Sequence, residues 1–183
     1  MIFLLIFLAF LILPVIYAIS LHNSIQRSKV KTDETRSGIG VQLQQRNDII
    51  PNLVETVKGY ASHESSTLND VIKWRNQSAN ARTFVEQNQA ETGLSRAMMN
   101  IMAVSENYPN LKADVHFQQL QSQLSILEEK IQISRDRYNS EARNYNSQLV
   151  VFPGNMVANF FNLKPVDFFI EEAESHKVSK VSF

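Results

Sequence analysis

The sequence predicts an all-α protein in which one N-terminal transmembrane helix precedes a bundle of long helices. Three observations support this prediction. The first twenty residues, MIFLLIFLAFLILPVIYAIS, carry no charged side chain, whereas all 18 basic and all 18 acidic residues lie beyond them. Two long stretches then repeat apolar residues at helical spacing. No segment alternates with a period of two for long enough to be a convincing strand.

Residues 1–21 are predicted to be a membrane anchor. As a helix, this segment spans about 30 Å, the thickness of the hydrocarbon core of a bilayer. Pro14 is tolerated within a membrane helix, and Tyr17 suits the membrane–water interface. The alternative is a cleaved signal peptide, which needs a basic start and a small-residue cleavage site. Met1 is followed by Ile-Phe-Leu with no Lys or Arg, so we expect the segment to be retained.

A juxtamembrane segment, residues 22–38, sets the predicted orientation. Residues 21–36 hold four basic and two acidic side chains, a net charge of +2. Positively charged flanks stay in the cytoplasm. We therefore predict an N-terminus outside the cell membrane and a C-terminal domain in the cytoplasm.

Residues 39–153 are predicted to form the bundle. Its first apolar stripe stays in phase through Pro51, which indicates either one kinked helix or two abutting helices. Arg46 falls on this stripe and needs an acidic partner, for which Glu141 is the candidate. The stripe consists of Ile39, Leu43, Ile50, Val54, Val57, Ala61, Leu68 and Val71.

A second stripe follows an almost strict heptad, as in a coiled coil, and ends at Phe152-Pro153-Gly154. Between the two stripes, Thr83–Gly93 has little periodicity and is predicted to be a loop. A helix is expected from Leu94 to Ser105, and a turn at Tyr108-Pro109-Asn110. The heptad positions are Phe117, Leu120, Leu124, Leu127, Ile131, Ser134, Tyr138, Glu141, Tyr145, Leu149 and Phe152.

The C-terminal tail, residues 154–183, is rich in aromatic side chains. Met156, Val157, Phe160 and Phe161 suit a short amphipathic turn, and Phe168 and Phe169 follow Lys164-Pro165. These rings either fold back to cap the bundle or form an interface with a partner or a second copy. The candidate interface residues are Phe160, Phe161, Phe168 and Phe169.

The run VQLQQRNDIIPNLVETVKGYASHE, residues 41–64, closely resembles the signature of the LemA family of bacterial membrane proteins. Further matches follow in order: ENYPNLKA at 106–113, Tyr138-Asn139, Tyr145-Asn146 and Phe152-Pro153. The resemblance implies a single-pass protein with its small N-terminus outside, a four-helix bundle of bromodomain-like topology, and no established enzymatic activity. The chain departs from the family pattern at Arg36-Ser37, where the family usually has Trp-Ser, and at Gly40, where it usually has an acidic residue.

The motif residues that the resemblance singles out are assigned structural roles. Tyr138-Asn139 and Tyr145-Asn146 repeat with a period of seven, so each Asn is expected to hydrogen-bond a neighbouring helix. The full set is Arg46, Asp48, Pro51, Asn52, Glu55, Tyr60, His63, Glu64, Tyr108, Pro109, Tyr138, Asn139, Tyr145, Asn146, Phe152 and Pro153.

The sequence offers no recognisable catalytic, cofactor-binding or metal-binding pattern. The absence of cysteine excludes disulfides and thiolate metal sites. His63-Glu64 lacks the second histidine of a zinc-binding helix. A formal net charge of zero gives no electrostatic reason to bind nucleic acid. No enzyme activity and no cofactor are therefore predicted.

These observations favour a non-enzymatic helical scaffold or adaptor anchored in a bacterial cell membrane. Long apolar stripes and an aromatic tail predict self-association into a homo-oligomer. Two alternatives stay open: a regulatory subunit that binds another membrane protein, and an enzyme of an unrecognised type.

Overall fold

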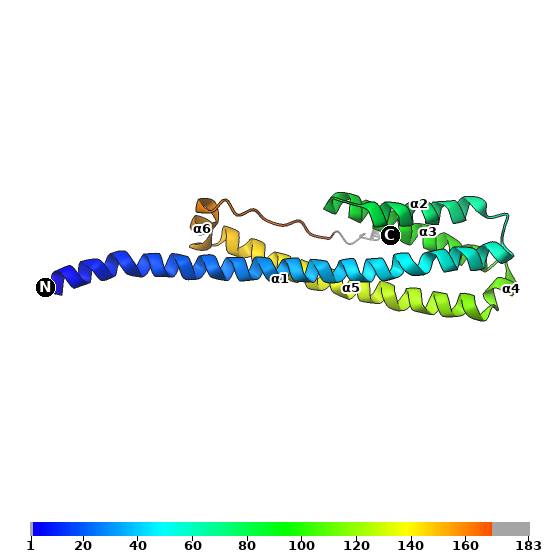
Figure 1. Ribbon diagram of the computed structural model, residues 1–183, viewed down its shortest axis with the longest axis horizontal. Helices are drawn as coiled ribbons and strands as arrows, with labels where there is room; N and C mark the ends of the chain where they lie inside the picture. The colour runs from blue at the N-terminus through cyan, green and yellow to red at the C-terminus, as the bar shows by residue number, and fades with distance from the viewer. Residues whose placement is uncertain (1, 170–183) are drawn as a thin grey trace, which may run out of the picture. The chain divides into compact units, whose positions relative to one another are not determined.

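The computed structural model describes residues 2–169, which form six helices and no strand. The all-α prediction is confirmed. The chain divides into two compact units, Met1–Arg46 with Leu124–Phe168 and Asn47–Gln123 with Phe169–Phe183, called here the first and second unit. In chain order the helices are α1 (Ile2–Tyr60), α2 (Ser65–Asn80), α3 (Phe84–Ser105), α4 (Pro109–Lys112), α5 (Val115–Val150) and α6 (Gly154–Phe160) (Figure 1).

Helix α1 is a single element of 59 residues, about 88 Å long at 1.5 Å per residue. Every described side chain from Ile2 to Ser20 is exposed. This part of α1 is long and apolar enough, by length and composition, to cross a membrane. The segment expected to be juxtamembrane, residues 22–38, belongs to the same helix, and Ile25 and Thr32 within it are buried. Packing therefore begins only a few residues beyond the apolar segment.

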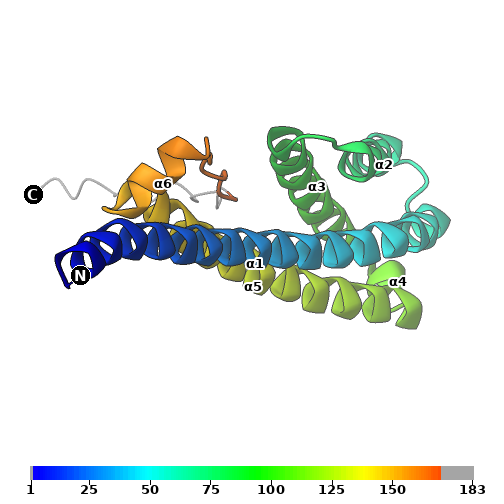
Figure 2. The same ribbon diagram turned by 60° about the vertical axis from the view of Figure 1, so that its left-hand side comes forward.

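The first unit pairs α1 with the C-terminal part of α5 and with α6. Both views show α5 lying beside α1 and leading into α6, which folds back against them (Figures 1 and 2). A cluster of buried side chains holds the three helices together: Ile25 from α1, Tyr145 and Leu149 from α5, and Val157 and Ala158 from α6. Because these residues come from three helices, their burial packs α6 of the C-terminal tail against both α1 and α5.

The predicted heptad stripe of α5 is buried along most of its length. Its buried members are Phe117, Leu124, Leu127, Ile131, Tyr138, Tyr145 and Leu149. The last member differs, since Phe152 is 74% exposed. Helix α5 ends at Val150, so the two residues before Pro153 leave the helical path and the heptad no longer decides which way they face.

The second unit contains a long helix where the sequence analysis predicts a loop. Helix α3 begins at Phe84, so the prediction of a loop over Thr83–Gly93 is wrong. Thr83 and Glu86 form a capping box, in which the Thr83 side chain accepts from the Glu86 backbone and the Glu86 carboxylate accepts from the Thr83 backbone. This pairing satisfies exposed N–H groups at the start of the helix, which offsets its weak apolar periodicity.

Pro51 does not interrupt α1, which is a single helix at this point. The helix ends at Tyr60, however, so the predicted apolar stripe continues onto a separate helix, α2, which carries Leu68 and Val71. Proline has no N–H, so the carbonyl of Asn47, one turn earlier, loses its helical donor. Arg75 on α2 supplies the replacement: its Nε lies 3.1 Å from the Asn47 carbonyl oxygen. A side chain from another helix thus completes the hydrogen bonding that Pro51 leaves open.

We predict that Arg75→Met destabilises the protein by about 1–3 kcal/mol, because the Asn47 carbonyl would lose its donor in a partly buried place. In a Pro51→Ala background the same change should cost markedly less, since alanine at this position restores the helical N–H. Urea unfolding of the full chain in detergent micelles, followed by circular dichroism, measures all four members of this double-mutant cycle.

Arg82→Met is the matched control, because Arg82 is exposed in the same unit and its change should stay within about 0.5 kcal/mol. Equal costs of Arg75→Met in the wild-type and Pro51→Ala backgrounds would show that Arg75 does not substitute for the missing amide.

Candidate functional site

A buried polar network joins α1, α2 and α3 in the second unit. Asn47 Nδ2 donates to Ser78 Oγ at 3.1 Å, and Ser78 Oγ donates to Glu91 Oε1 at 2.6 Å. Gln87 Nε2 donates to the same carboxylate oxygen at 2.9 Å. The network adjoins the backbone site beneath Pro51, because Asn47 takes part in both. Polar groups on three helices are thereby brought together, although the buried Oδ1 of Asn47 has no hydrogen-bond partner among the described residues.

The chemistry of this network favours architecture over catalysis. Glu91 and Ser78 are only 2% and 5% exposed, and the Ser78 hydroxyl hydrogen is already donated to a carboxylate. Neither a nucleophile nor a base is presented to solvent. Hydrogen bonds between buried polar groups require a defined geometry, and a shift of one helix would leave further groups of the network unpaired at a high cost in stability. We therefore interpret it as fixing the register of α2 and α3 against α1.

A groove of about 840 Å³ lies over α2, the α2–α3 connection and α3. Trp74, Arg82, Glu86 and Arg96 are among its lining residues. Gly93 allows the two helices to approach, since a Cβ at this position would lie 2.3 Å from Cδ2 of Trp74. Figure 2 shows α2 and α3 side by side. The groove thus brings an indole ring, two guanidinium groups and a carboxylate together on one surface.

Arg46 is paired, but its partner is not the one expected. Its Nη1 lies 2.8 Å from Oε1 of Glu128, and the Arg46 side chain is fully buried. Glu141 instead binds Lys31, at 2.7 Å. In an antiparallel pair, a residue further toward the C-terminus of α1 meets one nearer the N-terminus of α5, so Arg46 lies beside Glu128 and Lys31 beside Glu141. The hydrogen bond from Lys31 lowers the pKa of the Glu141 carboxyl.

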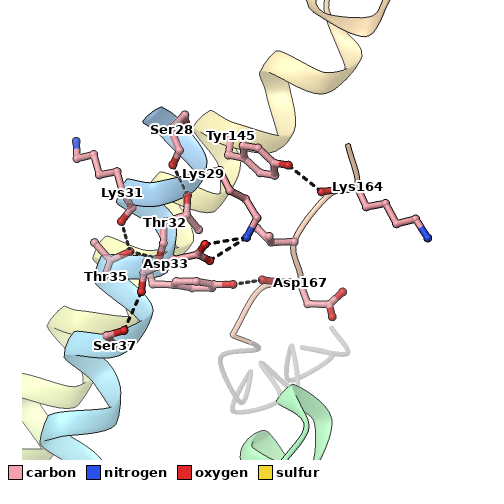
Figure 3. Close-up of polar contacts among 12 residues, drawn as sticks. Ser28, Lys29, Lys31, Thr32, Asp33, Thr35, Ser37, Tyr145, Lys164 and Asp167 are labelled. Atoms are coloured by element: carbon pink, nitrogen blue, oxygen red, sulfur yellow. Dashed lines mark hydrogen bonds and ion pairs between the residues drawn. The ribbon is translucent and has the colours of Figure 1, made fainter. Parts of the chain in front are cut away.

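The two tyrosines of the period-seven repeat bind the tail in the first unit. Tyr138 donates its hydroxyl to the carbonyl of Asp167 at 2.8 Å. Tyr145 donates to the carbonyl of Lys164 at 3.1 Å, as Figure 3 shows. Burial raises the pKa of both hydroxyls, which keeps them protonated as donors. Both rings lie in the core, as predicted for Tyr138 and Tyr145.

The asparagine beside the second tyrosine makes a backbone-like pair with the tail. Asn146 Nδ2 donates to the carbonyl of Val166, and Asn146 Oδ1 accepts from the N–H of Val166, both at 2.9 Å. The expectation that Asn146 bonds a neighbouring helix is therefore wrong, because its partner is an extended segment. Asn139 is buried on the same helix.

Four motif residues lie where helices of the second unit begin and end. Tyr60 donates its hydroxyl to Asp114 Oδ2 at 2.9 Å, and Tyr108 donates to Glu64 Oε1 at 3.3 Å. Tyr108 also precedes Pro109, the first residue of the short helix α4, so the predicted turn at Tyr108-Pro109-Asn110 is the start of a helix. These contacts tie connections between helices together.

Other motif residues face solvent. On α1, the exposed Asp48, Pro51, Asn52 and Glu55 recur at three- and four-residue spacing and so share one face, opposite the buried Ile50 and Leu53; His63, Phe152 and the side chains of Phe160, Phe161 and Phe168 are exposed as well. Pro153 precedes α6 as its N-cap residue.

The tail aromatics do not behave alike. Phe160 is 81% exposed, whereas Phe169 is buried, with its ring centroid 4.4 Å from that of Phe84. Val157 and Ala158, which precede Phe160 on α6, are buried in the core cluster of the first unit. The predicted interface set therefore contains exposed and buried rings, and residues 170–183 of the tail lie outside the described part of the chain.

The residues of the buried network escape the sequence analysis. Extending the stripe Leu94–Ser105 back by one heptad reaches Glu91 and Gln87, so a polar continuation of an apolar stripe is the signal that could reveal them. A proline inside a helix gives a second signal, because it demands a donor such as Arg75 for the freed carbonyl. Within residues 2–169, no three His, Asp or Glu side chains gather as a metal site would require.

Acid should weaken the start of α5 through Asp114. Its Oδ1 accepts from the backbone N–H of Phe117 at 2.8 Å, and this bond, with that from Tyr60, lowers the pKa of Asp114. The resulting stabilisation is complete above the ordinary carboxyl pKa, about 4, and is lost as the pH falls through the lowered value. Asp114→Asn should therefore show a smaller loss of stability between about pH 6 and about pH 2.

Tyr60→Phe should raise the pKa of Asp114 toward its ordinary value, as followed by carboxyl ¹³C NMR. Tyr17→Phe, a matched change in the apolar segment, should leave it unchanged. An Asp114 pKa that is indifferent to Tyr60→Phe would contradict the assigned hydrogen bond.

The comparisons with known proteins cover most of the chain. Residues 35–183 match the family model described as the LemA family. The chain is 25% identical to Protein LemA of Metamycoplasma hominis over 150 residues, 80% of this chain and 68% of that protein. It is 23% identical to Magnetosome protein MamQ 2 of Paramagnetospirillum magneticum, covering 82% of this chain and 65% of that protein. Magnetosome protein MamQ of Magnetospirillum gryphiswaldense is also 23% identical, with 75% and 60% covered. The chain thus spans about two thirds of the length of these relatives, and it belongs to the LemA family.

Proposed function

We propose that this protein is a non-enzymatic helical scaffold held in a bacterial cell membrane by the apolar part of α1. The observation that carries this proposal is the continuity of α1 within the first unit. The exposed apolar side chains up to Ser20 are followed directly by the buried Ile25 on the same helix. A membrane span built this way would position the packed unit rather than tether it loosely.

The proposed topology places the N-terminus outside and both units in the cytoplasm. The net charge of +2 over residues 21–36 supports this orientation. The bundle is expected to follow the four-helix, bromodomain-like topology that the family resemblance implies. Self-association is proposed because confinement to a membrane raises the effective concentration of copies without any new contact.

A regulatory subunit is the second candidate function, and the groove over α2 and α3 favours it. Its lining combines Trp74 with Arg82 and Arg96, residue types that are enriched in protein interfaces. A stable complex with another membrane protein would support this alternative. An enzyme of an unrecognised type would instead require convergent polar groups that bind a substrate in this groove.

Protease protection tests the orientation. A protease added to spheroplasts should leave the units intact, because the proposed domain lies behind the membrane. The same protease should digest them after lysis. Digestion of the domain in unlysed spheroplasts would reverse the topology.

The assembly is tested by the mass of the complex extracted at native expression in mild detergent. We expect more than one copy of this chain and no second protein. A monomer at every concentration would contradict self-association, and a defined second membrane protein would favour the regulatory subunit. Arg96→Ala, which alters the groove, with the exposed Arg137→Ala as control, shows whether the groove holds such a partner.

A further inference from the structure

The corner where α5 passes into α6 exposes several large apolar side chains in the first unit. We call this set the apolar corner. Its opposite side is packed, since Val157 and Ala158 of α6 belong to the buried cluster. The exposed fractions in the corner reach 81% at Phe160 and are at least half for the others. The apolar corner consists of Val150, Val151, Phe152, Met156, Phe160 and Phe161.

The corner lies in a part of the chain without formal charge. No Asp, Glu, Lys or Arg occurs in residues 144–163, between Arg143 and Lys164. The same holds for residues 1–26 of α1, where the first charged side chain is Arg27. Arg27, Arg143 and Lys164 are all exposed. Two segments that are distant in sequence therefore both lack charged side chains, and exposed basic residues border each of them.

These two uncharged segments touch. The ring of Phe161 lies 4.1 Å from that of His22, centroid to centroid. Leu21 packs against the cluster that contains Leu149 and Val157. The corner is thus beside the first residues of α1 beyond the apolar segment. From Leu21 to Arg27 the helix rises about 9 Å, comparable with the interfacial layer on one side of a bilayer.

We propose that the apolar corner is a second membrane contact, inserted in the interfacial layer of the leaflet through which α1 leaves the bilayer. This inference rests on the proposed membrane anchoring. Lipid is the occupant that the observations favour, because the corner is continuous with the membrane-spanning part of α1 and lacks charge. Exposed aromatic and aliphatic side chains suit this layer, and cations at its edge suit anionic head groups.

Two points of membrane contact would restrict the orientation of the first unit more than one point does. A single helix can rotate about its own axis and tilt, whereas a helix with an inserted corner on one side cannot rotate freely. The first unit would then present a constant face along the membrane surface. Val157 and Ala158 of α6 are packed in the buried cluster, and Tyr145 and Tyr138 bind the tail that follows α6, so the corner is carried on a packed support.

Spin labels on single cysteines test the proposal, because the chain has no native cysteine. Labels at Phe160→Cys and Met156→Cys are compared in the full-length protein in nanodiscs of phosphatidylcholine and phosphatidylglycerol. Leu13→Cys, in the apolar segment, is the lipid-exposed reference. Ser140→Cys, exposed on α5, is the water-exposed reference. Collision with oxygen and with a water-soluble nickel complex reports which phase surrounds each label.

We expect both corner labels to collide several-fold more with oxygen than with nickel, as at Leu13, and the Ser140 label to show the reverse. Nickel-accessible corner labels beside a lipid-exposed Leu13 label would overturn the second contact and leave the anchor intact. Nickel access at Leu13 as well would refute both the anchor and the corner. Corner labels shielded from both reagents and broadened by spin–spin coupling would identify a second copy as the occupant and also overturn the proposal. Circular dichroism confirms that each variant is folded.

Discussion

Beyond the apolar segment, α1 maintains its helical backbone hydrogen bonds through three residues that disfavour a helix. These are Gly38 and Gly40, which lie close together, and Pro51 further along. Gly38 and Gly40 each weaken a helix by about 1 kcal/mol relative to alanine, and both are exposed without any atom within 4 Å of a would-be Cβ. Packing on either side offsets this weakness, since Thr32, Ile39 and Leu43 are buried. At Pro51 the compensation is a hydrogen bond from Arg75. Continuity of α1 is therefore maintained by contacts made with other helices.

This dependence explains why polar residues accumulate at particular places. Arg46 and Lys31 on α1 bind Glu128 and Glu141 on α5, which sets the antiparallel register of the two helices in the first unit. A shifted register would break both pairs at once and would separate the fully buried Arg46 guanidinium from the Glu128 carboxylate. The tyrosines of the heptad repeat add a third constraint, because they bind backbone carbonyls of the tail.

The sequence is sufficient for the features that depend on composition and periodicity. The two stripes follow from local pattern, because burial of one helix face imposes its period on the residues. The apolar segment follows from composition, and the helix stop near Phe152-Pro153 follows from the proline. Pairings between helices do not follow from local pattern. The partner of Arg46 depends on the register of α5 against α1, and several acidic residues satisfy the same sequence rule. Asn146 likewise bonds an extended tail that no periodicity reveals. The start of α3 is predictable from the capping-box spacing of Thr83 and Glu86, but the weak apolar periodicity of the residues that follow indicates a loop.

The apolar part of α1, which we propose spans the membrane, and the packed first unit share one uninterrupted helix. Hydrogen exchange of the full-length protein in nanodiscs tests it at residues 22–38, which join the two. The account predicts slow amide exchange throughout this segment, comparable with that of residues 41–57, because helical hydrogen bonds and the burial of Ile25 and Thr32 protect it. Exchange at the rate of an unstructured chain across residues 22–38, with protection retained on both sides, would show a flexible tether and contradict the account.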